Sequence, residues 1–247
     1  MTHNQLKSYH ILNTRPQQQA SALSRCLREH GAQVTEQPAI DITFNHIQAD
    51  IHNINQYDIV IFVSANAADA VAAYWQPCNA TVLCVGPATQ HAVHKFHSET
   101  TTPHHFSSSG LLELPQLKNI KNNKVIIICG SNHNTYLSHQ LTSRGASVKL
   151  AISYQAQPIT TIDNKKILSI LEKKINIIIC TSSAGLTQVH AWFAQNAHLN
   201  ELLNTKVLVI SEKMHTLAQQ LGWLNDKILH SKNPTNHSIL DTLLQTA

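Results

Sequence analysis

Two kinds of hydrophobic pattern alternate along this chain. The first is a short run of β-branched and other aliphatic residues, and such runs cover residues 11–13, 34–38, 59–63, 82–85, 125–129, 148–153, 177–180 and 207–210. The second follows most of these runs and places hydrophobic residues every three or four positions, as one face of a helix requires. Unbroken apolar runs that alternate with helices are typical of parallel strands buried on both faces. The pattern therefore predicts an α/β fold with largely parallel sheets.

The segment after the first run shows how a helix is predicted. Pro16 suits a first helical turn because its φ is fixed and its missing N–H needs no partner there. Ala20 and Leu23 then fall on one face, and Gly31 ends the helix. The same pattern returns at residues 135–145.

Three segments of the chain occur twice, in the same order each time. The pairs are 58–71 with 176–189, 81–93 with 206–218, and a Gly-Ala-x-Val motif at 31–34 with another at 145–148. Solenoid repeats have periods of about 20–50 residues, so this much longer period indicates a duplicated domain. Two related domains that face one another predict a cleft.

Residues 37–44 and 151–159 do not fit the alternation of strand and helix. Each follows a Gly-Ala-x-Val strand and contains a proline, which is tolerated at strand edges but not in central strands. We expect both to connect the domains, so that the chain crosses to a second domain and returns. This predicts a discontinuous domain of residues 1–38 and 158–247, linker strands at 39–43 and 150–157, and a second domain at 44–149. A division near residue 120 fits the sequence alone equally well.

The composition narrows the classes of function. The 247 residues carry a formal charge of +4, and only 13% of them are charged, with no long Lys/Arg run to follow a phosphate backbone. Nucleic acid is therefore not expected as a partner, whereas an anionic small molecule stays open. No signal-peptide pattern or membrane-spanning run occurs, so we expect a soluble, cytoplasmic protein. The five cysteines form no C-x-x-C pair, which favours buried free thiols over disulfide or metal chemistry.

Small polar residues and glycines occur where predicted strands lead into helices. Open α/β sheets bind ligands at these places, beside free backbone N–H groups. The residues concerned are Thr14, Arg15, Ser64, Asn66, Gly86, Thr89, Gly130, Ser131, Thr181, Ser182, Ser183 and Ser211. Helix N-capping explains each single loop equally well, because Ser, Thr and Asn are preferred caps. Together, loops with many N–H and hydroxyl donors and few full charges favour a large ligand with several carboxylates.

Established catalytic motifs are absent from the sequence, which contains no G-x-S-x-G elbow, no phosphate-binding loop and no G-x-G-x-x-G. His91, His94 and His97 recur at a spacing that metal ligands can use. Exposed histidines in a chain with 17 of them are the simpler interpretation, so no metal site is expected. Tyr154, in the second connector, can either pack or donate a proton.

Seven segments in a specific order and spacing carry a family resemblance. They are NTRPQQQASALSRCLREHGAQVTEQPAIDI from Asn13, FVSANA from Phe62, VGPAT from Val85, SSSGLLELPQLKNIKNNKVIIICG from Ser107, LTSRGASVKLAISYQ from Leu141, CTSSAGL from Cys180 and VLVISEKMHTLAQQLGW from Val207. Together they resemble the uroporphyrinogen-III synthase family over nearly the whole chain. The second half looks most like its proteobacterial members.

The resemblance implies both a fold and a reaction. The implied fold has two similar parallel-sheet α/β domains, one of them flavodoxin-like and discontinuous, joined by a two-stranded linker. The implied enzyme is a lyase of haem biosynthesis that dehydrates and cyclises hydroxymethylbilane to uroporphyrinogen III, inverting ring D through a spirocyclic intermediate. No cofactor is implied. We expect a monomer that receives its substrate from hydroxymethylbilane synthase.

The resemblance also assigns roles to individual residues. The family's threonine in V-G-x-x-T corresponds to Thr89, its connector tyrosine to Tyr154, and its two Thr-Ser-type loops to Ser64 and to Thr181 with Ser182. Loss of a hydroxyl from an electron-rich pyrrole is intrinsically easy, so positioning should matter more than a strong base. Thr89 and Tyr154 are the expected catalytic residues, with Tyr154 donating a proton to the leaving hydroxyl or orienting it.

The sequence lacks several arginines that the family pattern contains. Related bacterial proteins often carry R-G-x-x-G-R after the fifth strand, where Cys129, Asn132 and Asn134 stand in this chain, and Gln155 replaces an arginine often found after the tyrosine. The residues that could supply part of the missing charge are Arg15, Lys213 and His133. The lost arginines leave a non-catalytic tetrapyrrole- or anion-binding protein on the same scaffold as the alternative. A two-domain solute-binding protein is a weaker alternative, because such proteins normally need export and the sequence shows no signal-peptide pattern.

Overall fold

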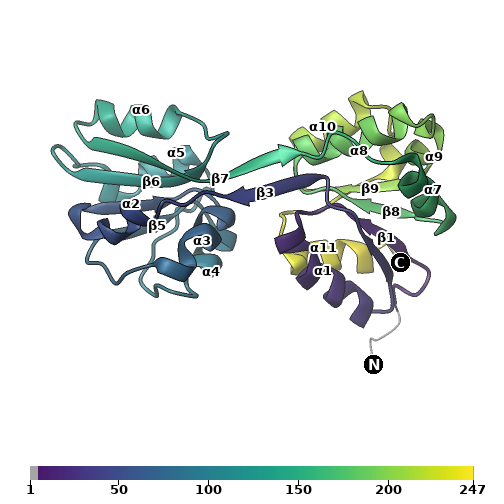
Figure 1. The fold of residues 1–247 in the computed structure, drawn as a ribbon, viewed down its shortest axis with the longest axis horizontal. Coiled ribbons are helices and arrows are strands. Elements are labelled where there is room, and N and C mark those ends of the chain that lie inside the picture. The colour runs from purple at the N-terminus through teal and green to yellow at the C-terminus, as the bar shows by residue number, and fades with distance from the viewer. Residues whose placement is uncertain (1–4, 247) are drawn as a thin grey trace. The chain divides into compact units, whose positions relative to one another are not determined.

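The computed structural model describes residues 5–246, and these form two units, each with its own five-stranded sheet (Figure 1). Unit 1 contains the described residues up to Ile42 and from Gln157 onward, and unit 2 contains Thr43–Ala156. Helices cover the sheet in each unit, so the predicted α/β class is confirmed.

In unit 1 the strand order is β10-β9-β8-β1-β2, and every neighbouring pair is parallel. The strands are β1 (His10–Asn13), β2 (Gln33–Glu36), β8 (Ile177–Ile179), β9 (Lys206–Val209) and β10 (Ile228–His230). The helices are α1 (Gln17–Glu29), α7 (Asn164–Glu172), α8 (Ser183–Gln195), α9 (Leu199–Asn204), α10 (Glu212–Gln220), the short η4 (Asn225–Lys227) and α11 (Asn236–Leu244). Helices α7 to α10 pack on one face of the sheet, and α1 and α11 on the other.

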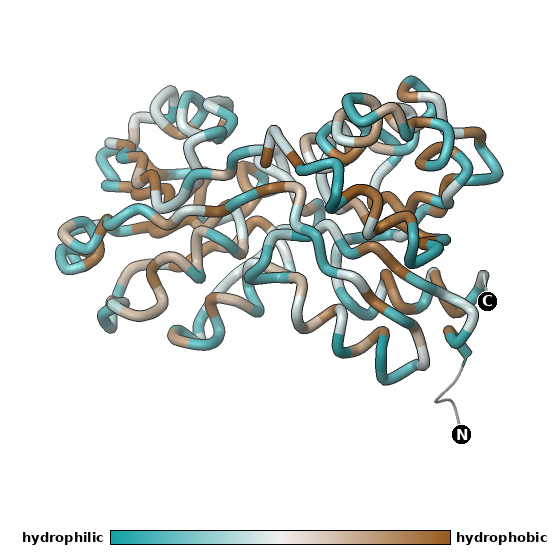
Figure 2. The backbone as a smooth tube through the Cα atoms, turned by 45° about the vertical axis from the view of Figure 1, so that its right-hand side comes forward, coloured by the Kyte–Doolittle hydropathy of each residue, from teal (hydrophilic) through white to brown (hydrophobic). Residues whose placement is uncertain are grey.

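In unit 2 the strand order is β3-β7-β6-β4-β5. The strands are β3 (Ile40–Phe44), β4 (Ile59–Phe62), β5 (Thr81–Cys84), β6 (Lys124–Gly130) and β7 (Ser147–Pro158). The helices are α2 (Gln48–His52), η1 (Ile54–Gln56), α3 (Ala65–Val71), η2 (Ala72–Tyr74), α4 (Pro87–Val93), α5 (Ser108–Glu113), η3 (Pro115–Leu117) and α6 (Tyr136–Ser143). The first five pack on one face of the sheet, and α5, η3 and α6 on the other. Figure 2 colours the backbone by hydropathy and shows hydrophobic stretches inside each unit. Strands β4 and β6 are buried along almost their whole length, as expected for a sheet covered on both faces.

Both sheets share one strand order once the path of the chain is taken into account. The order β9-β8-β1-β2 in unit 1 matches β5-β4-β6-β7 in unit 2. Strands β4 and β5 therefore correspond to β8 and β9, and β2 corresponds to β7, which are the pairs that carry the three sequence repeats. Each unit thus combines part of one repeat with part of the other, so the sequence halves are not the spatial units.

All eight predicted strands are strands in the structure, and the predicted connectors lie in β3 and β7. The boundary between the units falls inside these two strands, after Ile42 and after Ala156. Pro38 precedes β3 and Pro158 ends β7, which fits the restriction of proline to strand ends. Strand β10 was not predicted from the sequence, because three residues are too few to show a periodicity.

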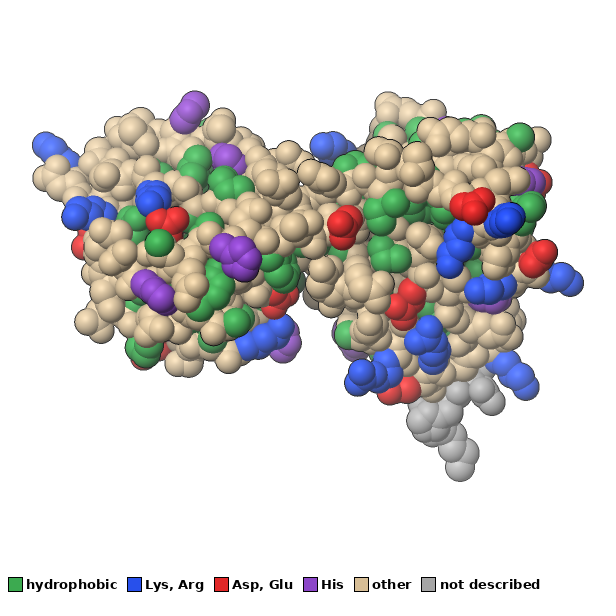
Figure 3. All heavy atoms as spheres, in the orientation of Figure 1, with side chains coloured by type: hydrophobic (Ala, Val, Ile, Leu, Met, Phe, Trp, Pro, Cys, Tyr) green, Lys and Arg blue, Asp and Glu red, His purple; other side chains and the backbone are tan. Residues whose placement is uncertain are grey.

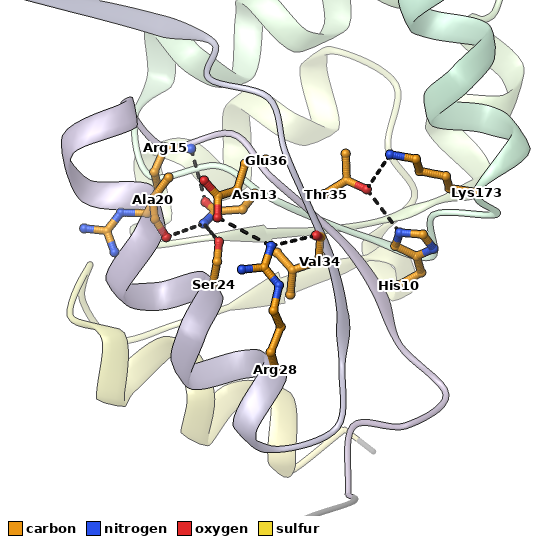
Figure 4. A network of polar contacts seen from close by, with 10 residues as sticks. All are labelled: His10, Asn13, Arg15, Ala20, Ser24, Arg28, Val34, Thr35, Glu36 and Lys173. Atoms are coloured by element: carbon orange, nitrogen blue, oxygen red, sulfur yellow. Dashed lines mark hydrogen bonds and ion pairs between the residues drawn. The ribbon is translucent and has the colours of Figure 1, made fainter.

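A buried hydrogen-bond network lies at the carboxyl end of β1 (Figure 4). The Asn13 side chain is fully buried, and its Nδ2 donates to the Ala20 carbonyl at 3.1 Å and to Ser24 Oγ at 3.0 Å. Its Oδ1 accepts the backbone N–H of Arg15 at 3.2 Å. Asn13 therefore ties α1 to β1 and fixes the backbone at Arg15.

Replacing Asn13 by alanine should lower the free energy of unfolding by about 1–3 kcal/mol, because buried polar groups lose their partners. Urea unfolding of the purified variant measures this change. Gln17→Ala, at an exposed position of α1, is the control and should stay within about 0.5 kcal/mol of the parent protein. Equal stability of the two variants would contradict a structural role for the network.

None of the helices in residues 5–246 combines the length and the apolar character needed to cross a lipid bilayer.

Candidate active site

The carboxyl edge of the unit 2 sheet holds a pocket. The strand order of this sheet reverses between β4 and β6, and open α/β sheets bind ligands at such a reversal. A pocket of about 280 Å³ lies there. Its lining residues are Val63, Ser108, Ile127, Cys129, Gly130, Ser131, Asn132, His133, Asn134, Leu137, Leu150, Tyr154 and Ala156. Three residues predicted from the sequence, Gly130, Ser131 and Tyr154, are thus brought together.

Strand β7 carries a bulge that sets the direction of Tyr154. Cys129 pairs with Ile152, but the next residue, Gly130, pairs with Tyr154, so Ser153 is the extra residue. Ile152 packs against the cluster below α5 and α6, whereas Tyr154 packs against the cluster below α3 and α4. Residues two apart in a regular strand share a face, so the bulge turns Tyr154 to the other side.

Tyr154 is held by residues of the two loops that follow β4 and β6. Ser64 caps α3 by accepting the N–H of Ala67 at 3.1 Å, and the same Oγ donates to Tyr154 Oη at 3.1 Å. The backbone N–H of Ser131 donates to the Tyr154 carbonyl at 2.9 Å. Because Ser64 supplies the proton of its contact with Tyr154, the phenol's own proton stays available to a ligand. The same contact would stabilise a phenolate once that proton has left.

Gly130 makes room for the phenol ring. A Cβ at this position would lie 2.6 Å from Cζ of Tyr154 and 2.9 Å from Oη. Ordinary carbon–carbon contacts are about 3.5–4.0 Å, so any side chain here would displace the ring. The role of Gly130 is therefore steric, whereas the sequence analysis had assigned it only to an anion-binding loop.

The other predicted residues of unit 2 lie at neighbouring loops and do not line this pocket. Gly86 caps α4, and Thr89 is buried in the first turn of that helix. Asn66 lies in the first turn of α3. A catalytic role for Thr89 and binding roles for Gly86 and Asn66 stay predictions.

In unit 1 the strand order reverses between β1 and β8, where several predicted residues meet. Thr14 Oγ1 donates to the Ile179 carbonyl at 2.7 Å, so the loops after β1 and β8 are joined directly. Thr181 and Ser183 flank Ser182, whose Oγ caps α8 by accepting the Gly185 N–H at 3.0 Å.

The next loop of unit 1 contains two further predicted residues. Ser211 caps α10 by accepting the Met214 N–H at 3.3 Å, and Lys213 is exposed in the first turn of that helix. Capping accounts for the hydroxyls of Ser182 and Ser211, as the alternative reading of these loops allowed. Their binding roles stay predictions.

Arg15 has the strongest anion-binding features in unit 1. Its guanidinium is nearly buried and donates only to neutral amides, Asn236 Oδ1 at 2.8 Å and Gln19 Oε1 at 3.3 Å. Its Nε lacks a partner, and no carboxylate among residues 5–246 forms an ion pair with it. Burial lowers the pKa of Arg15 to about 10, so it is still charged at neutral pH. A buried cation without a counter-charge is costly, and a ligand carboxylate would relieve that cost.

The histidine triplet does not form a metal centre in the part of the chain that is described. His91 and His94 are exposed, and His94 Nε2 contacts Thr100 Oγ1 at 2.8 Å. No group of three or more potential ligands among His, Cys, Asp and Glu occurs within residues 5–246.

Three polar residues that line the pocket were not predicted to be part of a site. Ser108 begins α5, which follows a loop and not a strand, so a search at strand ends passes over it. Asn132 and Asn134 entered the sequence analysis only as departures from a family motif. Their position directly after β6 was the signal that could have identified them.

Comparisons with known proteins agree with this architecture. The family model described as uroporphyrinogen-III synthase HemD matches residues 21–241. The uroporphyrinogen-III synthase of Salmonella typhimurium is 26% identical over 246 residues, covering 94% of this chain and 99% of that protein. The uroporphyrinogen-III synthase of Escherichia coli is 29% identical over 136 residues, so this chain spans about half of its length, 54%.

Two solved structures share the fold. Uroporphyrinogen-III synthetase from Helicobacter pylori has a TM-score of 0.63 at 15% identity, covering 97% of this chain and all of that one. A mutant uroporphyrinogen III synthase from Thermus thermophilus has a TM-score of 0.57 at 14% identity, with the same coverage of this chain. The family model spans most of the sequence, and the fold is the one its solved members have. This chain belongs to the uroporphyrinogen-III synthase family.

Proposed function

We propose that this chain is an active uroporphyrinogen-III synthase, a hydro-lyase that dehydrates and cyclises hydroxymethylbilane with inversion of ring D. Family membership supports the reaction. The observation that carries the proposal is the Tyr154 hydroxyl, which lines the unit 2 pocket and accepts a hydrogen bond from Ser64. That arrangement presents one donatable proton at a fixed position.

The proposed step moves this proton to the hydroxyl group of the substrate. As the C–O bond breaks, the hydroxyl leaves as water and the pyrrole nitrogen lone pair stabilises the methylene cation. The cation then bonds to the terminal pyrrole through the spirocyclic intermediate. After rearrangement, the proton lost from that ring returns to the Tyr154 phenolate. Ser64 stabilises the phenolate between the two transfers, and the second transfer returns the protein to its starting charge.

The environment of the phenol suits a reaction in which positioning dominates. The Tyr154 backbone is fixed by the bulge and by the Ser131 N–H, and its ring lies against Gly130. A fixed donor matters because closure at the wrong carbon gives a different isomer. Correct orientation of reacting groups can lower an activation barrier by about 7–11 kcal/mol, which is more than the lowering that a single general acid provides.

Turnover of freshly prepared hydroxymethylbilane tests the proposal. Purified protein should yield predominantly the type III isomer, whereas a reaction without protein yields the type I isomer by spontaneous closure. Heat-denatured protein serves as the control. Formation of type I alone would overturn the proposal. Binding of uroporphyrinogen without any change in isomer ratio would instead identify a non-catalytic binding protein.

Three finer features are proposed with the reaction. The free state of all five cysteines supports a reducing compartment, and we infer the cytoplasm. We also infer that the enzyme is a monomer and that hydroxymethylbilane synthase hands over the substrate, because the spontaneous closure competes with capture. A mass measurement by light scattering tests whether the enzyme is a monomer. A coupled reaction that runs faster than the reaction with free substrate would support the hand-over.

A further inference from the structure

The unit 2 pocket contains no permanently charged side chain, although the proposed substrate carries many carboxylates. Unit 2 holds six of the 18 Lys and Arg residues but nine of the 17 histidines. Figure 3 shows this contrast on one face, where most blue side chains lie on unit 1. None of the six Lys and Arg residues of unit 2 lines the pocket, whereas His133 does. Among the described residues that line this pocket, His133 is therefore the one that can carry a positive charge toward a carboxylate.

The hydrogen bonding of His133 leaves one ring nitrogen for a ligand. Nδ1 lies 3.1 Å from the Gly130 carbonyl, which can only accept, so Nδ1 carries a proton. Nε2 is then a bare acceptor in the neutral ring and a charged donor in the imidazolium. Gly130 thus orients two functional groups, because its carbonyl holds His133 and its Cα lies against the ring of Tyr154.

The pocket accommodates one pyrrole ring and not a whole tetrapyrrole. Its volume of about 280 Å³ lies just below the range of about 300–1,000 Å³ that encloses a drug-sized ligand. The Tyr154 hydroxyl must reach the substrate's hydroxymethyl group, so the ring that carries this group is the one that enters. That pyrrole also carries acidic side chains, which places a carboxylate within the same small pocket.

We propose that His133, as imidazolium, binds a carboxylate of the hydroxymethyl-bearing pyrrole and so places that ring beside Tyr154. This inference rests on the proposed function and adds the residue that selects the ring. The other titratable groups in the lining are Cys129 from β6 and Tyr154 from β7, and the lining residues of α5 and α6 carry no charge. Burial raises the pKa of Cys129 to about 11, so it is neutral near pH 7.

Three substitutions of His133 separate charge from shape. His133→Asn keeps a donor near Nδ1 for the Gly130 carbonyl but removes Nε2. It should raise KM for hydroxymethylbilane about five-fold, the upper range for a partly exposed ion pair, with little change in kcat. His133→Gln keeps a neutral donor near Nε2 and should also raise KM. His133→Arg retains a cation and should keep KM near that of the parent protein.

The pH dependence gives a readout that a merely structural role would not change. If the contact is an ion pair, KM of the parent protein should rise with pH as the imidazolium is lost. In His133→Arg that rise should disappear, because arginine stays charged. An unchanged KM in His133→Asn, or the same rise of KM with pH in His133→Arg, would overturn the inference.

Binding of uroporphyrin III, a stable octacarboxylate, distinguishes this inference from the proposed function. An absorbance titration should show about five-fold weaker binding to His133→Asn than to the parent protein. Such weakening in a protein that forms no type III isomer would support the carboxylate contact while the proposed reaction failed. If the parent protein forms the type III isomer, and if KM and the affinity for uroporphyrin are the same in His133→Asn, the carboxylate contact is overturned while the proposed reaction is supported.

Discussion

Tyr154→Phe is expected to lower kcat for hydroxymethylbilane about ten-fold or more, the loss typical of removing a general acid. The substitution deletes only the hydroxyl, which is the acceptor of the Ser64 hydrogen bond and the donor to the leaving group. The ring, its contact with Gly130 and the bulge in β7 remain. KM should therefore change much less than kcat, because the shape of the pocket is kept.

A matched control is available on α6 in the same unit. Tyr136 is exposed and does not line the pocket, so Tyr136→Phe should keep the activity of the parent protein. Initial rates of type III isomer formation at saturating substrate measure both variants. Full activity of Tyr154→Phe would move the proton donor elsewhere, to solvent. The isomer ratio should stay unchanged in that case, since solvent can protonate a leaving hydroxyl without altering where the chain closes.

Gly130→Ala is expected to lower kcat between about ten-fold and 100-fold, the loss that a displacement of about 1 Å in a reacting group can cause. The new Cβ would lie 2.6 Å from Cζ of Tyr154, so the ring must move away. This movement weakens the contact with Ser64 and reduces the space for substrate. Both kcat and KM should respond, in contrast to Tyr154→Phe. Steady-state kinetics on hydroxymethylbilane measure the two constants separately.

Combining the two substitutions tests whether Gly130 acts through Tyr154. If the main effect of the alanine is to displace the hydroxyl, the double variant should have nearly the kcat of Tyr154→Phe alone. Effects that multiply would show that the two residues act independently. Urea unfolding of Gly130→Ala completes the test, because a stability close to that of the parent protein excludes loss of folded enzyme as the cause.

Much of the fold was predictable because parallel sheets produce continuous apolar runs. All eight such runs form strands, and the duplication revealed that two sheets share one plan. The three-residue β10 was missed because its sequence is too short for any periodicity to emerge. The confirmed fold class and family rest on signals spread over many residues, which a few substitutions cannot hide.

The pocket was harder to predict because it depends on registers between strands. Ser64 and Tyr154 were predicted separately. Their contact depends on a bulge at Ser153, which no local sequence pattern predicts. Gly130 was singled out as a loop residue, and its steric role appears only when Tyr154 is placed against it. The roles of the predicted residues therefore stay predictions until the variants are measured.

The interleaved strand order has a consequence for the order in which the protein can fold during synthesis. Strands β4 to β7 of unit 2 are contiguous, but β1 of unit 1 pairs with β8, which begins at Ile177. At about 5–20 residues per second, the ribosome needs on the order of 10 s after β2 to deliver that partner. Until then the edge of β1 that pairs with β8 in the finished sheet stays without its partner. We expect unit 2 to fold first. The N-terminal part of unit 1 can complete its sheet only after the C-terminal part has been synthesised.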